Sequence, residues 1–232
     1  MSKYTMSWQR TESGTPQALA FRITRRRIPG LVAAACLTPL SLLLASCSKA
    51  APWHSLDVSG SAPPLQFSMT RASDGKLVTN ADYHGQVVML YFGYTFCPDV
   101  CPTTLTNLSQ ILGQLGPDAQ QVRVLFVTVD PNRDTLAVLK AYVQNFAPQV
   151  DGLRGTPDQL ASLARRYRLV YSVTPETRSH PYEVTHASGI YVFDRSGAAR
   201  LLVPSLDSAT PDSAGIELDL KRLIAEKSSP RT

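Results

Sequence analysis

Nearly continuous apolar runs occur three times along the chain, and such runs are typical of strands buried on both faces of a sheet. They cover residues 87–92, 122–129 and 189–193. Two shorter runs, 65–69 and 76–79, flank the turn at 73–75 and predict an N-terminal β-hairpin. A second turn at 195–197 predicts a last strand at 200–203.

Apolar residues at three- and four-residue spacing predict four helices among these strands. The apolar stripes run through residues 105–115, 136–146, 160–167 and 216–224. Gly116 and Pro117 end the first helix, and Pro148 follows the second. Strands that alternate with helices predict an α/β domain, in which a central mixed sheet is flanked by helices.

The N-terminal residues have the pattern of an export signal. Three arginines at 25–27 precede an uncharged apolar stretch at 28–45, which is short for a membrane-spanning helix. The sequence Leu-Ala-Ser-Cys at 44–47 resembles a bacterial lipobox, so we expect Cys47 to be lipidated. An uncleaved membrane anchor is the alternative. Both interpretations tether the protein to a membrane, with its domain facing the periplasm or the cell exterior.

These patterns divide the chain into four parts. Residues 1–46 are interpreted as a lipoprotein signal peptide, and 47–64, rich in Ser, Ala and Pro, as a lipid-anchored flexible tether. One domain follows at 65–227, and 228–232 form a tail.

The distribution of charge excludes one function. The chain carries a formal net charge of +5. Six of its 23 basic residues but one of its 18 acidic residues precede Cys47, so 17 of each remain from Cys47 onward. A neutral domain offers no basic face to phosphates, and we therefore expect no nucleic-acid partner.

The positions of the four cysteines indicate a single reactive or metal-binding pair in the domain. Cys36 would leave with the signal and Cys47 would carry lipid, which leaves Cys97 and Cys101 in the domain. They lie between a predicted buried strand and the next helix, where thioredoxin-like folds place their redox pair. A helix N-terminus favours the thiolate, which attacks disulfides or binds soft metals. Three intervening residues, in place of the usual two of redox pairs, favour metal binding; two buried, inert cysteines are the alternative.

A metal held by two sulfurs needs a further ligand, and the chain has four histidines. His180 and His186 both lie in a polar segment before a predicted strand, and spacing alone does not choose between them. Two thiolates and one imidazole suit copper as Cu(I), or as Cu(II) with an added oxygen ligand. Structural zinc would require a fourth protein ligand.

Three sequence blocks together resemble the Sco/SenC family. They are YTFCPDVCP at 94–102, VDPNRDT at 129–135, and YEVTHAS at 182–188 followed by YVFD at 191–194. The resemblance covers residues 63–226 and implies a thioredoxin-like fold and a role in building the CuA centre of cytochrome c oxidase. The subunit that carries CuA, and a periplasmic copper donor, would be its partners. Carried over by position, the copper ligands are Cys97, Cys101 and His186.

The chain departs from the family pattern at two positions. Thr185 stands where the family commonly has Asp before the ligand histidine, and loss of that carboxylate would weaken Cu(II) binding. Leu136 stands where the family often has Pro, at the start of a helix.

Four charged residues near these blocks have structural interpretations beside functional ones. Asp130 follows a strand, and Asp134 is expected to cap the next helix. Asp130 and Arg133 are candidates for supporting the metal site or docking a partner. Asp99, between the cysteines, would modulate the charge of the site, contact a partner, or be a solvated acid at a helix start.

The sequence therefore predicts a tethered copper chaperone that transfers its ion by ligand exchange. A thiol-disulfide oxidoreductase, in which Cys97 attacks a disulfide and Cys101 resolves the intermediate, is the main alternative and would not require His186. A copper or redox sensor is a third interpretation. A thiol peroxidase is a fourth, for which no supporting arginine and threonine arrangement stands out around Cys97.

Overall fold

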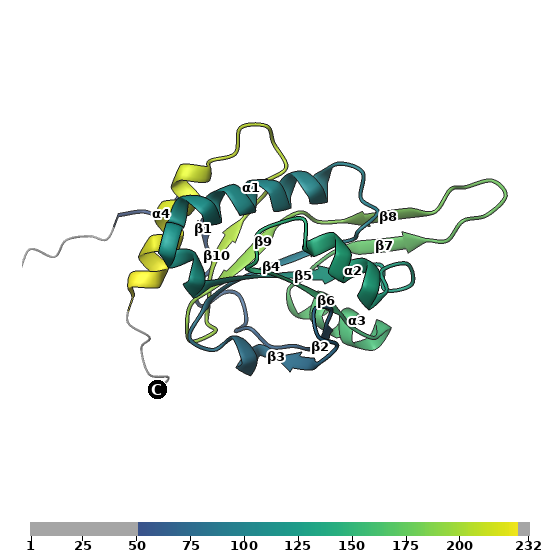
Figure 1. Ribbon diagram of the computed structural model, residues 1–232, viewed down its shortest axis with the longest axis horizontal. Helices are drawn as coiled ribbons and strands as arrows, with labels where there is room; N and C mark the ends of the chain where they lie inside the picture. Colours follow the sequence, from purple (N-terminus) through teal and green to yellow (C-terminus); the bar gives the residue numbers. More distant parts are fainter. Residues whose placement is uncertain (1–50, 227–232) are drawn as a thin grey trace, which may run out of the picture. The chain divides into compact units, whose positions relative to one another are not determined.

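A computed structural model describes residues 51–226, and in this part of the chain eight strands form one sheet (Figure 1). The order across the sheet is β1-β10-β9-β4-β5-β6-β2-β3. The strands are β1 (Leu56–Asp57), β2 (Ser68–Arg71), β3 (Leu77–Thr79), β4 (Val87–Gly93), β5 (Val122–Thr128), β6 (Val150–Arg154), β9 (Ile190–Phe193) and β10 (Ala199–Val203). Strands β4, β5 and β6 are parallel and the other pairs are antiparallel, which makes the sheet mixed.

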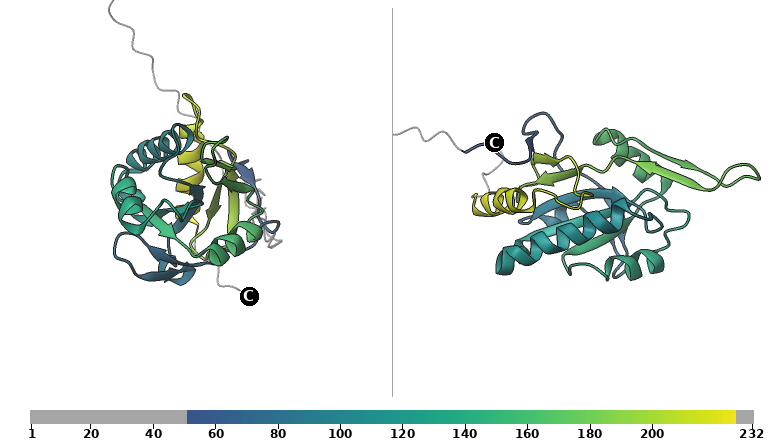
Figure 2. Two further views of the ribbon diagram at one scale, coloured as in Figure 1. Left: turned by 90° about the vertical axis from the view of Figure 1, so that its right-hand side faces the viewer. Right: turned by 90° about the horizontal axis from the view of Figure 1, so that it is seen from above.

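Helices cover both faces of this sheet. They are α1 (Val100–Leu115), α2 (Leu136–Val143), α3 (Pro157–Arg166) and α4 (Ser213–Ala225). Figure 2 shows α1, α2 and α4 on one face and α3 on the other. Two short 3-10 turns, η1 (Asn80–Tyr83) and η2 (Gly116–Gln121), connect elements. The predicted mixed sheet flanked by helices, with an N-terminal hairpin formed by β2 and β3, is confirmed.

The core lies on both sides of β4, whose seven residues are all buried. On the face covered by α1 and α2, the ring of Tyr91 packs against Phe126 of β5, which packs in turn against Tyr142 of α2. On the opposite face, Tyr167 after α3 packs against Tyr191 and Phe193 of β9. A strand covered on both sides explains the continuous apolar run.

Capping threonines set where two of the helices, α2 and α3, begin. Thr135 caps α2, because its hydroxyl accepts the N–H of Val138. The expectation that Asp134 caps this helix is wrong, because its carboxylate accepts three hydrogen bonds from Thr95 and Thr128. Thr156 forms a capping box at α3.

A second, two-stranded sheet projects from the main one. It consists of β7 (Tyr171–Thr174) and β8 (Glu183–His186) and extends beyond the end at which α1 begins (Figure 1). Neither strand was predicted, because both are short and alternate buried or half-buried residues with exposed ones in a polar segment. This hairpin brings His186 to the sheet.

The described part of the segment expected to be a flexible tether is attached to the domain. Residues 56 and 57 form β1 against β10. The buried carboxylate of Asp219 in α4 accepts the backbone N–H groups of His54 and Ser55. The expected signal peptide, Cys47 and the tail at 228–232 lie outside the described residues. Within residues 51–226, no helix combines the length and the apolar character needed to cross a membrane.

Candidate metal centre

The two cysteines lie where β4 passes into α1. Cys101 is in the first turn of α1 and fully buried, whereas Cys97, in the preceding loop, is half-buried. Gly93 permits this packing, because a Cβ atom there would lie 2.9 Å from the sulfur of Cys101 and 2.5 Å from the ring of Phe126. Both thiols are free, and the backbone N–H of Cys101 donates to Cys97 Sγ at 3.4 Å.

His186 reaches the cysteines from the end of β8. Its Nε2 lies 3.4 Å from Cys101 Sγ. Its Nδ1 lies 3.0 Å from the carbonyl oxygen of Ala187, and a carbonyl only accepts, so Nδ1 carries the proton and the Nε2 lone pair faces the sulfurs. The ring of Tyr94 packs edge-on against the imidazole at 5.8 Å.

The three predicted ligand residues therefore meet. One donor atom each from Cys97, Cys101 and His186 lies within 4.8 Å of the others. His180 is exposed outside this cluster, where its ring contacts Ser179 and its backbone N–H donates to Thr177. Geometry thus separates two histidines that spacing alone left equivalent.

The two thiols differ in acidity. The hydrogen bond that Cys101 donates lowers the pKa of Cys97 and outweighs the opposing effect of burial, so Cys97 is the thiolate of the pair. The pKa of Cys101 is raised by its hydrogen bond to Cys97 and by burial. Burial, followed by the neighbouring Cys97, raises the pKa of Tyr94 to about 12, which keeps this phenol neutral beside the cluster.

The cluster opens into a shallow hollow with a mainly apolar wall. Its lining residues are Tyr94, Cys97, Pro98, Asp99, Val100, Val184, Thr185 and His186. The Asp99 side chain makes no cap bond to α1, and Thr103 donates to it at 3.4 Å. Thr185, which replaces the carboxylate expected from the family, pairs its hydroxyl with Ser172 across the hairpin.

The donor set fits a soft metal ion. Two sulfurs and one imidazole nitrogen are the ligands that copper prefers, and one sulfur and the nitrogen lie at the edge of a hollow. No fourth side chain of the kind that completes a structural zinc site belongs to the cluster in the described part of the chain.

Comparison with known proteins places the chain in a family. The family model described as SCO1/SenC matches residues 63–219, well over half of the sequence. The chain belongs to the SCO1/SenC family. Its fold is thioredoxin-like, as the sequence predicted.

Individual SCO1/SenC relatives agree with this assignment. The mitochondrial SCO2 homologue of Bos taurus is 44% identical over 125 residues, which cover 53% of this chain and 47% of that protein. The chain thus spans about half the length of the curated relatives it matches. Copper-bound ScoI of Bradyrhizobium japonicum is 36% identical with a TM-score of 0.60, covering 70% of this chain and 99% of that one. A SCO1/SenC family lipoprotein from Bacillus anthracis is 25% identical with a TM-score of 0.61, covering 73% and 99%.

Asp130 and Arg133 of this SCO1/SenC domain are engaged inside the molecule. The carboxylate of Asp130 is fully buried and accepts the Nε–H of Arg133 at 2.5 Å. The carboxylate of Asp130 is thus covered in this conformation, and a docking role for Asp130 stays a prediction. The side chain of Arg133 is 30% exposed.

Several residues around the cluster were missed by sequence reasoning. The hydroxyl groups of Tyr91, Thr104 and Tyr142 are buried without a hydrogen-bond partner. Burial, and then the nearby Cys101, raises the pKa of both phenols. Their apolar neighbours made them look like ordinary core positions, so no sequence signal marked them.

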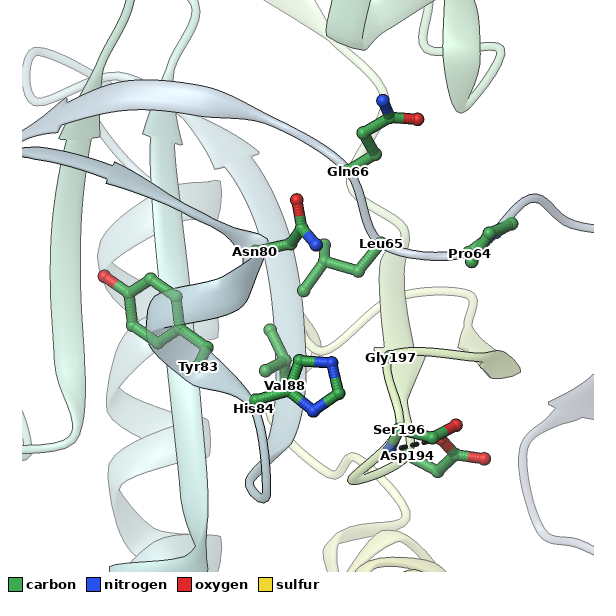
Figure 3. A pocket seen from close by; sticks show the side chains of 10 residues that line it. All are labelled: Pro64, Leu65, Gln66, Asn80, Tyr83, His84, Val88, Asp194, Ser196 and Gly197. Carbon is green, nitrogen blue, oxygen red and sulfur yellow. Dashed lines mark hydrogen bonds between the residues drawn. The ribbon is translucent and has the colours of Figure 1, made fainter. Parts of the chain in front are cut away.

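A separate hollow lies at the opposite end of β4, between η1 and the turn after β9 (Figure 3). Leu65, His84 and Asp194 are among its lining residues, and the Asp194 carboxylate is bound by Ser196. None of the predicted site residues lines it.

Proposed function

We propose that this protein is a membrane-tethered copper chaperone that holds one ion through Cys97, Cys101 and His186 and assists assembly of the CuA centre of cytochrome c oxidase. The convergence of the three donor atoms within 4.8 Å carries the proposal. Membership of the SCO1/SenC family and likeness to a relative with copper bound support it.

The burial of the ligands suits a transfer function. Cys101 is enclosed, whereas Cys97 and His186 lie at the hollow and are half-buried. Incoming thiolates or imidazoles of a recipient can replace His186 and then Cys97, so that the ion is never released into water. Copper is the cargo of this exchange, and its oxidation state need not change. The subunit that carries CuA is the proposed recipient, and a periplasmic copper protein is the proposed donor.

Copper titration tests the site. The domain from about residue 48 onward, with reduced thiols and without oxygen, is titrated with Cu(I) and Cu(II) beside Cys97→Ala, Cys101→Ala and His186→Ala. We expect one tightly held ion, a sulfur-to-copper charge-transfer band with Cu(II), and weaker binding in each variant. His180→Ala is the matched control, since this exposed histidine lies outside the cluster. Wild-type retention in His186→Ala contradicts the ligand assignment.

A second function, thiol-disulfide exchange, is favoured by the unequal acidity of the thiols. The Cys97 thiolate would attack a disulfide, and Cys101 would then displace the mixed disulfide, leaving a Cys97–Cys101 disulfide and two thiols on the partner. An external thiol reductant would have to restore the pair. His186→Ala should leave this reduction largely intact while copper retention falls. Loss of both activities in that variant would contradict their separation.

Membrane attachment through a lipid on Cys47 is part of the proposal, and the lipobox-like sequence at 44–47 supports it. The full chain should fractionate with membranes, whereas Cys47→Ser should leave the signal uncleaved and unlipidated. A metabolically incorporated fatty acid that labels both proteins equally would contradict this assignment.

A further inference from the structure

A buried carboxylate links the loop that follows β5 to the hairpin that carries His186. Asp130 accepts the phenol O–H of Tyr182 at 2.7 Å and the Nε–H of Arg133 at 2.5 Å. Tyr182 directly precedes β8, four residues before His186. A bond at Tyr182 thus constrains the strand that presents the imidazole.

The Asp130 end of this link is fixed. Its backbone N–H donates to Thr128 Oγ1, and its carbonyl oxygen accepts the backbone N–H groups of Arg133 and Asp134. The side chain of Asp130 has no exposed surface. Pro131, next in the chain, is held by two bonds from Arg154 of β6. These bonds hold the Asp130 carboxylate in a fixed position, just beyond the C-terminal end of β5.

Arg133 extends the link to the loop at residues 94–99, between β4 and α1, which carries Cys97 and is called the cysteine loop below. Its guanidinium carbon lies 3.9 Å from the ring centre of Tyr182, 4.8 Å from that of Phe96 and 5.9 Å from that of Tyr94. Phe96 directly precedes Cys97, and Tyr94 packs against His186. Cation–π contacts of one guanidinium thus join the cysteine loop to the histidine hairpin.

The hairpin itself is lightly held. It forms its own two-stranded sheet, and among its eight strand residues only Val184 is buried. An element with few buried contacts opens at low free energy, so a single strong bond to it changes its motion.

We propose that Asp130, Arg133 and Tyr182 form a latch that holds the β7–β8 hairpin against the cysteine loop and thereby sets how readily His186 leaves the metal. These are positioning residues, and they touch no cargo. This inference rests on the proposed copper site. A recipient that displaces Tyr182 from Asp130 would free the histidine and promote transfer.

Tyr182→Phe tests the latch, because it removes one hydroxyl and keeps the ring over Arg133. Tyr83→Phe is the matched control: the Tyr83 hydroxyl donates to the Asp151 carboxylate at 3.0 Å, away from the cluster. Two rates are measured. One is hydrogen exchange of the β8 amides in the reduced, metal-free protein, and the other is loss of Cu(I) to excess chelator from the loaded protein.

We expect Tyr182→Phe to raise both rates about tenfold, which corresponds to about 1.4 kcal/mol. Tyr83→Phe should leave both unchanged, and core amides in β4 should exchange as in wild type in either variant. Wild-type rates in Tyr182→Phe overturn the latch. Uniformly faster exchange, in β4 as well as β8, also overturns it, since the bond would then be merely structural. A wild-type protein that holds no copper contradicts the proposed function. In that case hydrogen exchange of the β8 amides in the metal-free protein is the measurement that tests the latch.

Discussion

Gly93 has no side chain, and the sulfur of Cys101 packs against the backbone of β4 at this position. The absence of a Cβ atom at Gly93 is therefore required for this copper ligand to lie where it does. We expect Gly93→Ala to lower the free energy of unfolding by about 1–3 kcal/mol, because the added Cβ overlaps Phe126 and Cys101. It should also weaken copper retention. Gly113→Ala is the control: a Cβ at this position in α1 meets open space, and stability should rise by about 0.5–1 kcal/mol. Denaturant unfolding measures both, and equal stability of the two variants would contradict this packing.

The lowered pKa of Cys97 makes a prediction about reactivity. A group with a lowered pKa stays deprotonated as the pH falls, so the thiolate remains available. In the reduced, metal-free protein, iodoacetamide should modify Cys97 at a rate that changes little between about pH 8 and about pH 6, whereas the rate for free cysteine should fall by about 70-fold with its thiolate fraction. Cys101, buried and with a raised pKa, should stay unmodified. Mass spectrometry of the peptides identifies the site, and earlier labelling of Cys101 would contradict the assignment.

Among the helices and strands, those with a strong apolar periodicity could be predicted from the sequence. Those that form mainly because they pair with neighbouring strands could not. The runs behind β4 and β5 and the stripes of α1 and α4 gave clear signals, because each buries a continuous surface. Strand β6 contains Gly152 and only a few apolar residues, yet it pairs with β5 and β2. Gly152 is required in this strand, because a Cβ atom at this position would lie 2.7 Å from the side chain of Leu139.

The residues of the candidate site also differ in how well the sequence predicted them. Cys97 and Cys101 were evident from residue type and spacing, whereas the choice of His186 over His180 came from the family resemblance. The bond of Asp130 with Tyr182 joins residues 52 positions apart, and no local pattern encodes such a bond. Asp134 looked like a helix cap for the same reason: its true partners, Thr95 and Thr128, lie outside the helix.

The boundary of α2 gives a test of this correction. Asp134→Ala removes a buried carboxylate and leaves three donors unpaired, so it should cost about 2–3 kcal/mol of folding free energy. Thr135→Ala removes only the N-cap bond to Val138 and should cost about 1 kcal/mol. Asp158→Ala, at an exposed first-turn position of α3, serves as the control and should change little. Chemical denaturation ranks the three variants, and a larger loss in Thr135→Ala than in Asp134→Ala would contradict the role given to the buried Asp134 carboxylate.

At the scale of the whole domain, the N-terminal segment and the metal cluster lie at different ends. Residues before β1 attach to α4, where Trp53 packs on the guanidinium of Arg222 at 3.7 Å and Asp219 binds the backbone. The cluster lies where β4 ends and α1 begins, beside the projecting hairpin (Figure 1). A tether attached at one end would therefore leave the copper site accessible at the other.

Asp219 should be important for this attachment. Asp219→Ala leaves the N–H groups of His54 and Ser55 without their acceptor, and we expect a loss of about 1–3 kcal/mol in unfolding free energy. Backbone amides of residues 54–57 should exchange faster, while copper retention stays at the wild-type level. Glu217→Ala, which removes an ion pair with Lys221 on the same helix, should cost about 0.5 kcal/mol or less. Unchanged exchange at 54–57 in Asp219→Ala would show that the segment is held by other contacts.

The central claim is that two sulfurs and one imidazole hold the ion, and X-ray absorption at the copper edge tests it most directly. The Cu(I)-loaded domain should show two sulfur neighbours and one nitrogen neighbour, with the imidazole scattering lost in His186→Ala and retained in His180→Ala. Coordination by sulfur alone in the wild type, or the same nitrogen signal in wild type and His186→Ala, would contradict the three-ligand site.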